Sequence, residues 1–100
     1  MADIRFLEQL EALIRQRLKD MPEGSYTAKL ANRGATGVAQ KVGEEGVELA
    51  LAGAAQNDEA VIAEAADLLY HMLVLLGFRH IAFADVVDEL TSRHTAEIED

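Results

Sequence analysis

The segment from residue 58 to residue 78 constrains the fold most, because it is apolar on almost every side. On a helix of 100° per residue, its valine, leucine, isoleucine and methionine side chains cover a wide arc, which Tyr70 and Val74 extend toward the far side. A helix that is apolar nearly all round lies at the centre of its bundle. The segment therefore predicts an all-α fold with this helix in the middle.

The rest of the chain carries the signals of four further helices, three long and one short. Asp3, Ser25 and Asp58 stand where N-caps are expected, and Gly34 is placed to end the short helix. Apolar residues with three–four spacing predict the first helix, which ends near the only proline of the chain. The expected helices cover residues 4–21, 26–33, 38–55, 59–78 and 83–98.

Size, cysteine content and charge exclude several classes of protein. One hundred residues are expected to form one domain, 1–100, and the absence of cysteine excludes disulfides, thiolate zinc sites and iron–sulfur clusters. A net charge of −9 argues against nucleic acids and anionic membranes as partners. Because Glu64, Asp67 and His71 interrupt the longest apolar run and no signal peptide is visible, we expect a soluble, cytoplasmic protein.

Acidic residues stand at unexpected places on two of the expected helices. Glu45 falls within the apolar seam of the helix over 38–55, and Glu48 borders it. A carboxylate in a core seam is costly unless it is paired, protonated or bound to a cation. Glu64 and Asp67, on the central helix, share a 60° stripe with His71, which we interpret as a hydrogen-bonded neighbour of the site rather than a ligand.

Two acidic pairs with i, i+3 spacing on adjacent helices can enclose a small volume with four carboxylates. Such hard oxygen ligands without cysteine favour Mg²⁺, with Mn²⁺ as the second choice. The basic residues of segment 25–43, which carries no acid, are the natural contacts for a metal-bound polyphosphate: Lys29, Arg33 and Lys41. The alternative for both groups is an ordinary solvated charged surface.

Three blocks of the chain closely resemble the phosphoribosyl-ATP pyrophosphohydrolase family, a branch of the MazG-like all-α nucleotide pyrophosphohydrolases. They are Ser-Tyr-Thr-Ala-Lys-Leu at 25–30, Gln-Lys-Val-Gly-Glu-Glu-Gly-Val-Glu at 40–48, and the segment 64–76. The resemblance spans about residues 4–94. It implies Mg²⁺-dependent hydrolysis of phosphoribosyl-ATP to phosphoribosyl-AMP and pyrophosphate, the second step of histidine biosynthesis. It also implies a homodimer, whose paired helices complete a MazG-like bundle.

The same resemblance assigns roles to individual positions. Four carboxylates match the metal ligands of the family's catalytic centre: Glu45, Glu48, Glu64 and Asp67. Glu44 matches the first Glu of the motif and is the expected accessory ligand. Separately from the resemblance, Glu48 is the preferred general base, because it borders the apolar seam. Lys41 matches a lysine near the phosphates, and Ser25, Tyr26 and Lys29 match a block at the entrance for substrate. Where the family usually has a basic residue, this chain has Thr36-Gly37, and Arg33 is the candidate substitute.

Two other functions compete with this interpretation. One is a housekeeping pyrophosphohydrolase that acts on (d)NTPs and shares the metal site. The other is a non-catalytic helical oligomerisation module in which the acidic stripe is vestigial.

Overall fold

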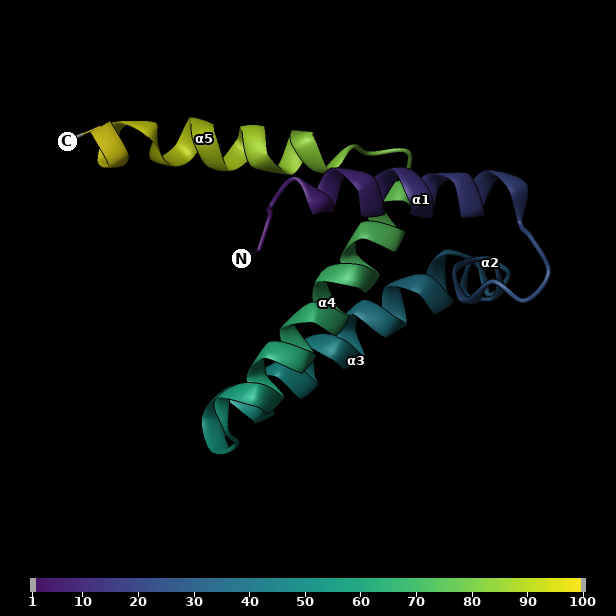
Figure 1. The fold of residues 1–100 in the computed structure, drawn as a ribbon, viewed down its shortest axis with the longest axis horizontal. Coiled ribbons are helices and arrows are strands. Elements are labelled where there is room, and N and C mark those ends of the chain that lie inside the picture. Colours follow the sequence, from purple (N-terminus) through teal and green to yellow (C-terminus); the bar gives the residue numbers. More distant parts are fainter. Residues whose placement is uncertain (1, 100) are drawn as a thin grey trace.

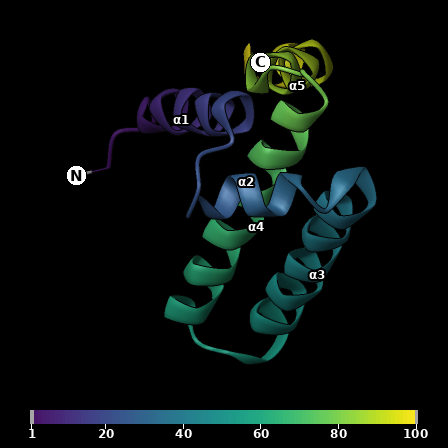
Figure 2. The same ribbon diagram turned by 90° about the vertical axis from the view of Figure 1, so that its right-hand side faces the viewer.

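Helices α3 (Gly34–Ala55) and α4 (Asp58–Phe78) form a long antiparallel hairpin that organises the rest of the chain (Figure 1). Helix α1 (Phe6–Asp20) crosses α4 near the C-terminal end of α4. The short helix α2 (Tyr26–Ala31) lies between α1 and the start of α3 (Figure 2). The two helices on which the acidic pairs were expected are therefore the two arms of this hairpin.

Helix α5 (Phe83–Glu99) turns away from the end of α4 and projects from the hairpin. The start of α5 is attached to α1, since the backbone N–H of Phe83 donates to Oε2 of Glu11 at 2.6 Å. The computed structural model describes residues 2–99, and no strand occurs among them. The predicted all-α class, with four long helices and one short one, is confirmed.

The most deeply buried apolar cluster lies where α1, α2 and the start of α3 meet the C-terminal half of α4. These three helices contribute one side chain each and α4 contributes two, all at most 2% exposed: Ile14, Leu30, Val38, Leu73 and Val74. Half-buried leucines and aromatic residues surround this cluster. The central position predicted for α4 is thus confirmed for its C-terminal half.

The N-terminal half of α4 and the facing turns of α3 leave large apolar side chains uncovered. Ile62 is 69% exposed, and Val47 and Leu51 are 59% and 60% exposed. On length and composition alone α4 would also suit a membrane span, a property that core helices share. Two of its central polar residues instead contact protein: Glu64 lies among carboxylates of α3, and His71 bonds to α2.

Two of the three predicted N-caps are wrong. The carboxylate of Asp3 accepts from the backbone N–H of Arg5 in a turn that precedes α1, and the helix begins only at Phe6. The cap of α4 is Asn57, whose extended backbone lets Oδ1 accept from the N–H of Ala60 at 3.0 Å. Ser25 is confirmed as the cap of α2, where Oγ accepts from the N–H of Ala28.

The boundary between α2 and α3 also differs from the prediction. Helix α2 ends at Ala31 rather than at residue 33, and α3 begins four residues earlier than expected. Gly34 has a φ of +77°, so it redirects the chain into α3 instead of closing α2. Gly37 is buried in the first turns of α3, where a Cβ atom would lie 2.5 Å from Cβ of Arg33. The glycine-rich start of α3 is therefore a tight helical junction.

Candidate metal centre

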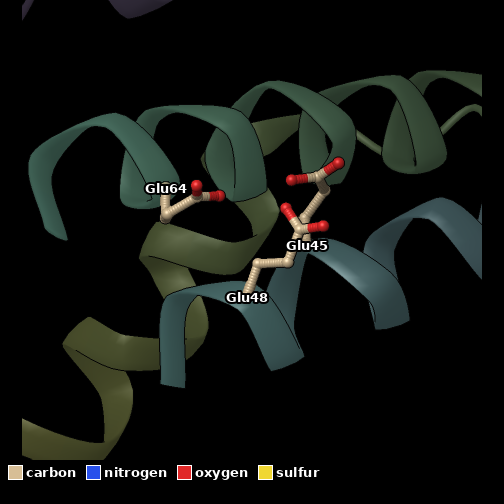
Figure 3. A group of neighbouring side chains, drawn as sticks. All are labelled: Glu45, Glu48 and Glu64. Carbon is tan, nitrogen blue, oxygen red and sulfur yellow. The ribbon is translucent and has the colours of Figure 1, made fainter. Parts of the chain in front are cut away.

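Three carboxylates from the two arms of the hairpin converge in the space between α3 and α4. Glu45 and Glu48 lie one turn apart on α3, and Glu64 faces them from α4 (Figure 3). One carboxylate oxygen from each residue lies within 4.8 Å of the corresponding oxygens of the other two. The antiparallel pairing of the helices brings Glu64 next to Glu48 although sixteen residues separate them.

The seam position predicted for Glu45 is confirmed by its burial. Glu45 is only 6% exposed and lies on the same side of α3 as Val38 and Ala52, which are fully buried. Its Oε1 is 3.4 Å from Nζ of Lys41, one turn earlier on the helix. Its Oε2 and Oε2 of Glu64 are buried without any hydrogen-bond partner. Unpartnered buried carboxylate oxygens are costly, so the site has unsatisfied capacity for a cation.

The cluster perturbs the ionisation of its neighbours. The negative charge of Glu45, and next the proximity of the Glu64 carboxyl group, raise the pKa of Glu48 above its usual range. The carboxylate of Glu45 raises the pKa of Lys41, to which the Tyr26 phenol also contributes. Lys41 therefore stays cationic at neutral pH, and the three glutamates repel one another.

The donor set fits a hard divalent cation. All the converging atoms are carboxylate oxygens, which Mg²⁺ and Mn²⁺ prefer, and two of them lack a partner. A single nearby ammonium group cannot balance three carboxylates. The geometry thus supports a metal site formed by Glu45, Glu48 and Glu64.

The other two predicted ligands lie outside this converging group. Asp67 and Glu44 are exposed, and the carboxylate of Glu44 accepts a long bond of 3.5 Å from Nε2 of Gln40. The stripe expected to unite Glu64, Asp67 and His71 divides in the structure. Glu64 lies among the carboxylates of α3, Asp67 is exposed, and His71 is buried and bonded to α2. The ligand roles of Asp67 and Glu44 remain predictions.

A polar network at the side of the metal centre joins α2 to α4. The hydroxyl of Tyr26 lies 2.8 Å from Nε2 of His71, and Nδ1 of His71 lies 2.7 Å from the backbone oxygen of Asp67. A second bond of 2.6 Å links Oγ1 of Thr27 to the hydroxyl of Tyr70. Sequence reasoning missed this second pair, since nothing in the spacing of the two residues indicates that they meet.

The residues predicted to contact substrate are distributed around α2 and the start of α3. Ser25, Tyr26 and Lys29 line a groove of about 600 Å³ along the turn before α2 and its first residues. Lys41 lies beside Glu45, and Nε of Arg33 lies against Gly37. The structure thus brings three of the five predicted residues to one groove, while Arg33 lies at the start of α3 and Lys41 lies beside the carboxylates.

Comparison with known proteins identifies a family and several relatives whose sequences are similar to that of this chain. A family model described as phosphoribosyl-ATP pyrophosphohydrolase matches residues 7–94. A protein of Metallosphaera sedula named phosphoribosyl-ATP pyrophosphatase is 53% identical over 87 residues, which are 87% of this chain and 94% of the relative. A protein of Pyrobaculum calidifontis with the same name is 52% identical over 87 residues, or 93% of its length.

Longer proteins also match this chain. The histidine biosynthesis bifunctional protein HisIE of Xanthomonas axonopodis pv. citri is 52% identical over 90 residues, which are 90% of this chain and 44% of that protein. The chain therefore spans slightly less than half the length of these bifunctional relatives.

Proposed function

Because this chain belongs to the phosphoribosyl-ATP pyrophosphohydrolase family, we propose that it hydrolyses phosphoribosyl-ATP to phosphoribosyl-AMP and pyrophosphate. This reaction would serve the second step of histidine biosynthesis, with residues 1–100 acting as one catalytic domain. The observation that carries the proposal is the pair of unpartnered, buried carboxylate oxygens of Glu45 and Glu64. A protein without need of a cation would gain stability by replacing such groups with apolar side chains.

The proposed cofactor is Mg²⁺, with Mn²⁺ as a substitute. Glu45, Glu48 and Glu64 would hold it, and Asp67 and Glu44 are the candidates for further ligands. A bound divalent cation neutralises negative charge on the phosphate oxygens of the substrate and of the leaving pyrophosphate. The oxygen-only donor set supports these metals over zinc.

Side chains of the protein itself would orient the reactants. Glu48 lies at the exposed rim of the cluster and is the candidate general base that takes a proton from the attacking water. Lys41, held cationic beside Glu45, would face the phosphates. Arg33, Lys29, Ser25 and Tyr26 would bind the rest of the substrate. Arg33 would replace the basic residue that the family usually has at 36–37.

We also propose a homodimer, which would complete a MazG-like bundle. Val47, Leu51 and Ile62 present large, exposed apolar side chains on both arms of the hairpin. A second copy of the hairpin would cover this face and form a four-helix core. The proposed location is the cytoplasm, with neither nucleic acid nor membrane as a partner.

The decisive experiment measures pyrophosphate release from phosphoribosyl-ATP with Mg²⁺ and with EDTA. Metal-dependent release from phosphoribosyl-ATP, well above release from dCTP and dUTP, is the expected result. Faster turnover of dCTP or dUTP would identify a housekeeping nucleotide pyrophosphohydrolase instead. Release from none of them, together with no calorimetric binding of Mg²⁺, would favour a non-catalytic oligomerisation module.

A further inference from the structure

Arg17 is a basic residue that belongs to none of the predicted contacts with substrate. It stands in the last turn of α1 and lines a cavity of about 190 Å³ between α1, α2 and α4. Apolar side chains of α1 and four hydroxyl-bearing residues complete the lining, the latter being Ser25, Tyr26, Thr27 and Tyr70. Among the described residues that line this cavity, Arg17 is therefore the only charged one.

A second basic residue, Lys29, lines the neighbouring groove beside α2. The cavity and the groove adjoin, because Ser25 and Tyr26 line both. Glu23, in the groove, is the one acid among the described lining residues. In the part of the chain that the structure describes, no ion pair involves Arg17 or Lys29. Both cations are therefore available to an anionic ligand.

The hydroxyl group of Ser25 can add a hydrogen bond to such a ligand. Its Oγ accepts from the backbone N–H of Ala28, which uses a lone pair and leaves the hydroxyl hydrogen available. Arginine, lysine and hydroxyl donors bind phosphate groups well, and the guanidinium group of Arg17 can bind two phosphate oxygens at once. The chemistry of this region therefore fits a phosphate group.

This region is distinct from the carboxylates between α3 and α4. None of the described residues that line the cavity or the groove belongs to the carboxylate cluster. Tyr26 links the two regions, since its hydroxyl bonds to His71 of α4 and its phenol contributes to the raised pKa of Lys41. A substrate that reached both regions would need two anionic groups, one at the metal and one near Arg17.

Phosphoribosyl-ATP has two such groups. Its name describes ATP that carries an additional ribose with a phosphate of its own, whereas ATP and the dNTPs have the triphosphate alone. We propose that Arg17, together with Lys29 and Ser25, binds the phosphate of the phosphoribosyl group and so determines the specificity of the reaction. The inference rests on the proposed function, because it assigns one end of that substrate to the metal centre and the other to α1 and α2. A nucleotide without the second phosphate would leave these cations unpaired.

The inference is tested by calorimetry in the presence of Mg²⁺, with two ligands that differ only in the phosphoribosyl group, phosphoribosyl-AMP and AMP. Arg17→Gln should weaken binding of phosphoribosyl-AMP about 10-fold to 100-fold, the effect of losing hydrogen bonds to a charged group, and should change AMP binding by less than about twofold. Arg17→Lys keeps the charge and should recover part of the loss. Lys29→Gln should show the same selectivity as Arg17→Gln.

The matched control is Lys19→Gln. Lys19 stands in the same last turn of α1 and loses the same charge, but it lines a different hollow, with Arg15 and His80. This variant should bind both ligands as the unmodified protein does. Equal weakening of phosphoribosyl-AMP binding by Arg17→Gln and Lys19→Gln would indicate general attraction by the charge of α1 and would overturn the inference. An equal loss of AMP and phosphoribosyl-AMP binding in Arg17→Gln would overturn it as well.

Steady-state kinetics provide a second measurement. Arg17→Gln should lower kcat/KM for phosphoribosyl-ATP about 10-fold to 100-fold and should leave the inhibition constant of ATP, added as a competitor, within about twofold. An unchanged kcat/KM would overturn the inference but not the proposed function, which depends on the unmodified protein alone. Absence of hydrolysis by the unmodified protein would contradict the proposed function, while calorimetry would still decide whether Arg17 recognises the phosphoribosyl group.

Discussion

The ammonium group of Lys41 lies 3.4 Å from Oε1 of Glu45, while Oε2 of the same carboxylate is buried without a hydrogen-bond partner. The positive charge of Lys41 therefore offsets the charge of Glu45 at Oε1, while Oε2 has no partner. The same carboxylate belongs to the cluster with Glu48 and Glu64. A single positive charge cannot offset three carboxylates within 4.8 Å of one another. Without a cation this cluster destabilises the hairpin, so cation binding, stability and activity should be linked.

Glu45→Gln should abolish most of the activity while the helical fold persists. The variant removes the buried carboxylate that would hold the cation, and loss of metal-based charge stabilisation of several kcal/mol lowers kcat/KM by at least about 100-fold. Glu59→Gln is the matched control, because Glu59 is an exposed carboxylate on α4 outside the converging group. Circular dichroism checks the fold, and equal losses in both variants would contradict the central role of Glu45.

Glu48→Gln should stabilise the metal-free protein, and more so as the pH rises. The pKa of Glu48 is raised above its ordinary value of 4.5, chiefly by the charge of Glu45, so the folded state binds this proton more strongly than the unfolded chain. The resulting stability is present below the ordinary pKa and is lost as the pH rises through the folded value. The Tm difference in EDTA between the variant and the unmodified protein should therefore grow as the pH rises above the ordinary pKa of 4.5. A constant difference would contradict this.

Mg²⁺ should stabilise the unmodified protein against urea, and Glu64→Gln should lose most of this effect. A ligand that binds only the folded state adds about 2.7 kcal/mol at one hundred times its Kd. Glu64 supplies one of the two unpartnered buried oxygens, so its loss should weaken binding. Titration of the urea midpoint with MgCl₂ measures the shift, and Glu59→Gln, an exposed change on the same helix, serves as the control.

Leu51→Glu should convert the proposed dimer to monomer. Leu51 is 60% exposed on α3, and a charge there would have to be buried between the two copies. Sedimentation velocity at micromolar concentration measures the state. Leu13→Glu places the same charge on α1, where the leucine is 44% exposed, and should leave the dimer intact. A monomeric unmodified protein with full activity would refute the proposed dimer.

Two glycines of α3 should respond in opposite ways to alanine. In Gly37→Ala the new Cβ would lie 2.5 Å from Cβ of Arg33, so the junction must shift, at a cost of about 1–3 kcal/mol. Gly43 is exposed within the helix and has no atom within 4 Å of its Cβ position, so Gly43→Ala should stabilise by about 0.4–1 kcal/mol. Urea denaturation measures both, and similar effects would contradict the tight junction at Gly37.

Much of the fold could be read from local signals, because helix periodicity and burial depend on residues a few positions apart. The apolar arc of residues 58–78 predicted α4, and the placement of Glu45 in an apolar seam correctly indicated its burial. Predictions that depended on the backbone of single residues were less reliable. Asn57 caps α4 in place of Asp58, since the extended conformation falls one residue earlier, and Gly34 begins α3 where it was expected to end α2.

The sequence by itself determined the all-α class, the helix that forms the core, and the carboxylates available for a cation, because these follow from residue type and helical spacing. Only the tertiary structure decided which carboxylates meet. The antiparallel hairpin turns Glu64 toward Glu45 and Glu48 and leaves Asp67 outside the converging group. It also decided the partners of Tyr26, whose hydroxyl meets a histidine 45 residues away. Such contacts depend on how two helices rotate and pack against each other, which the spacing along either helix does not specify.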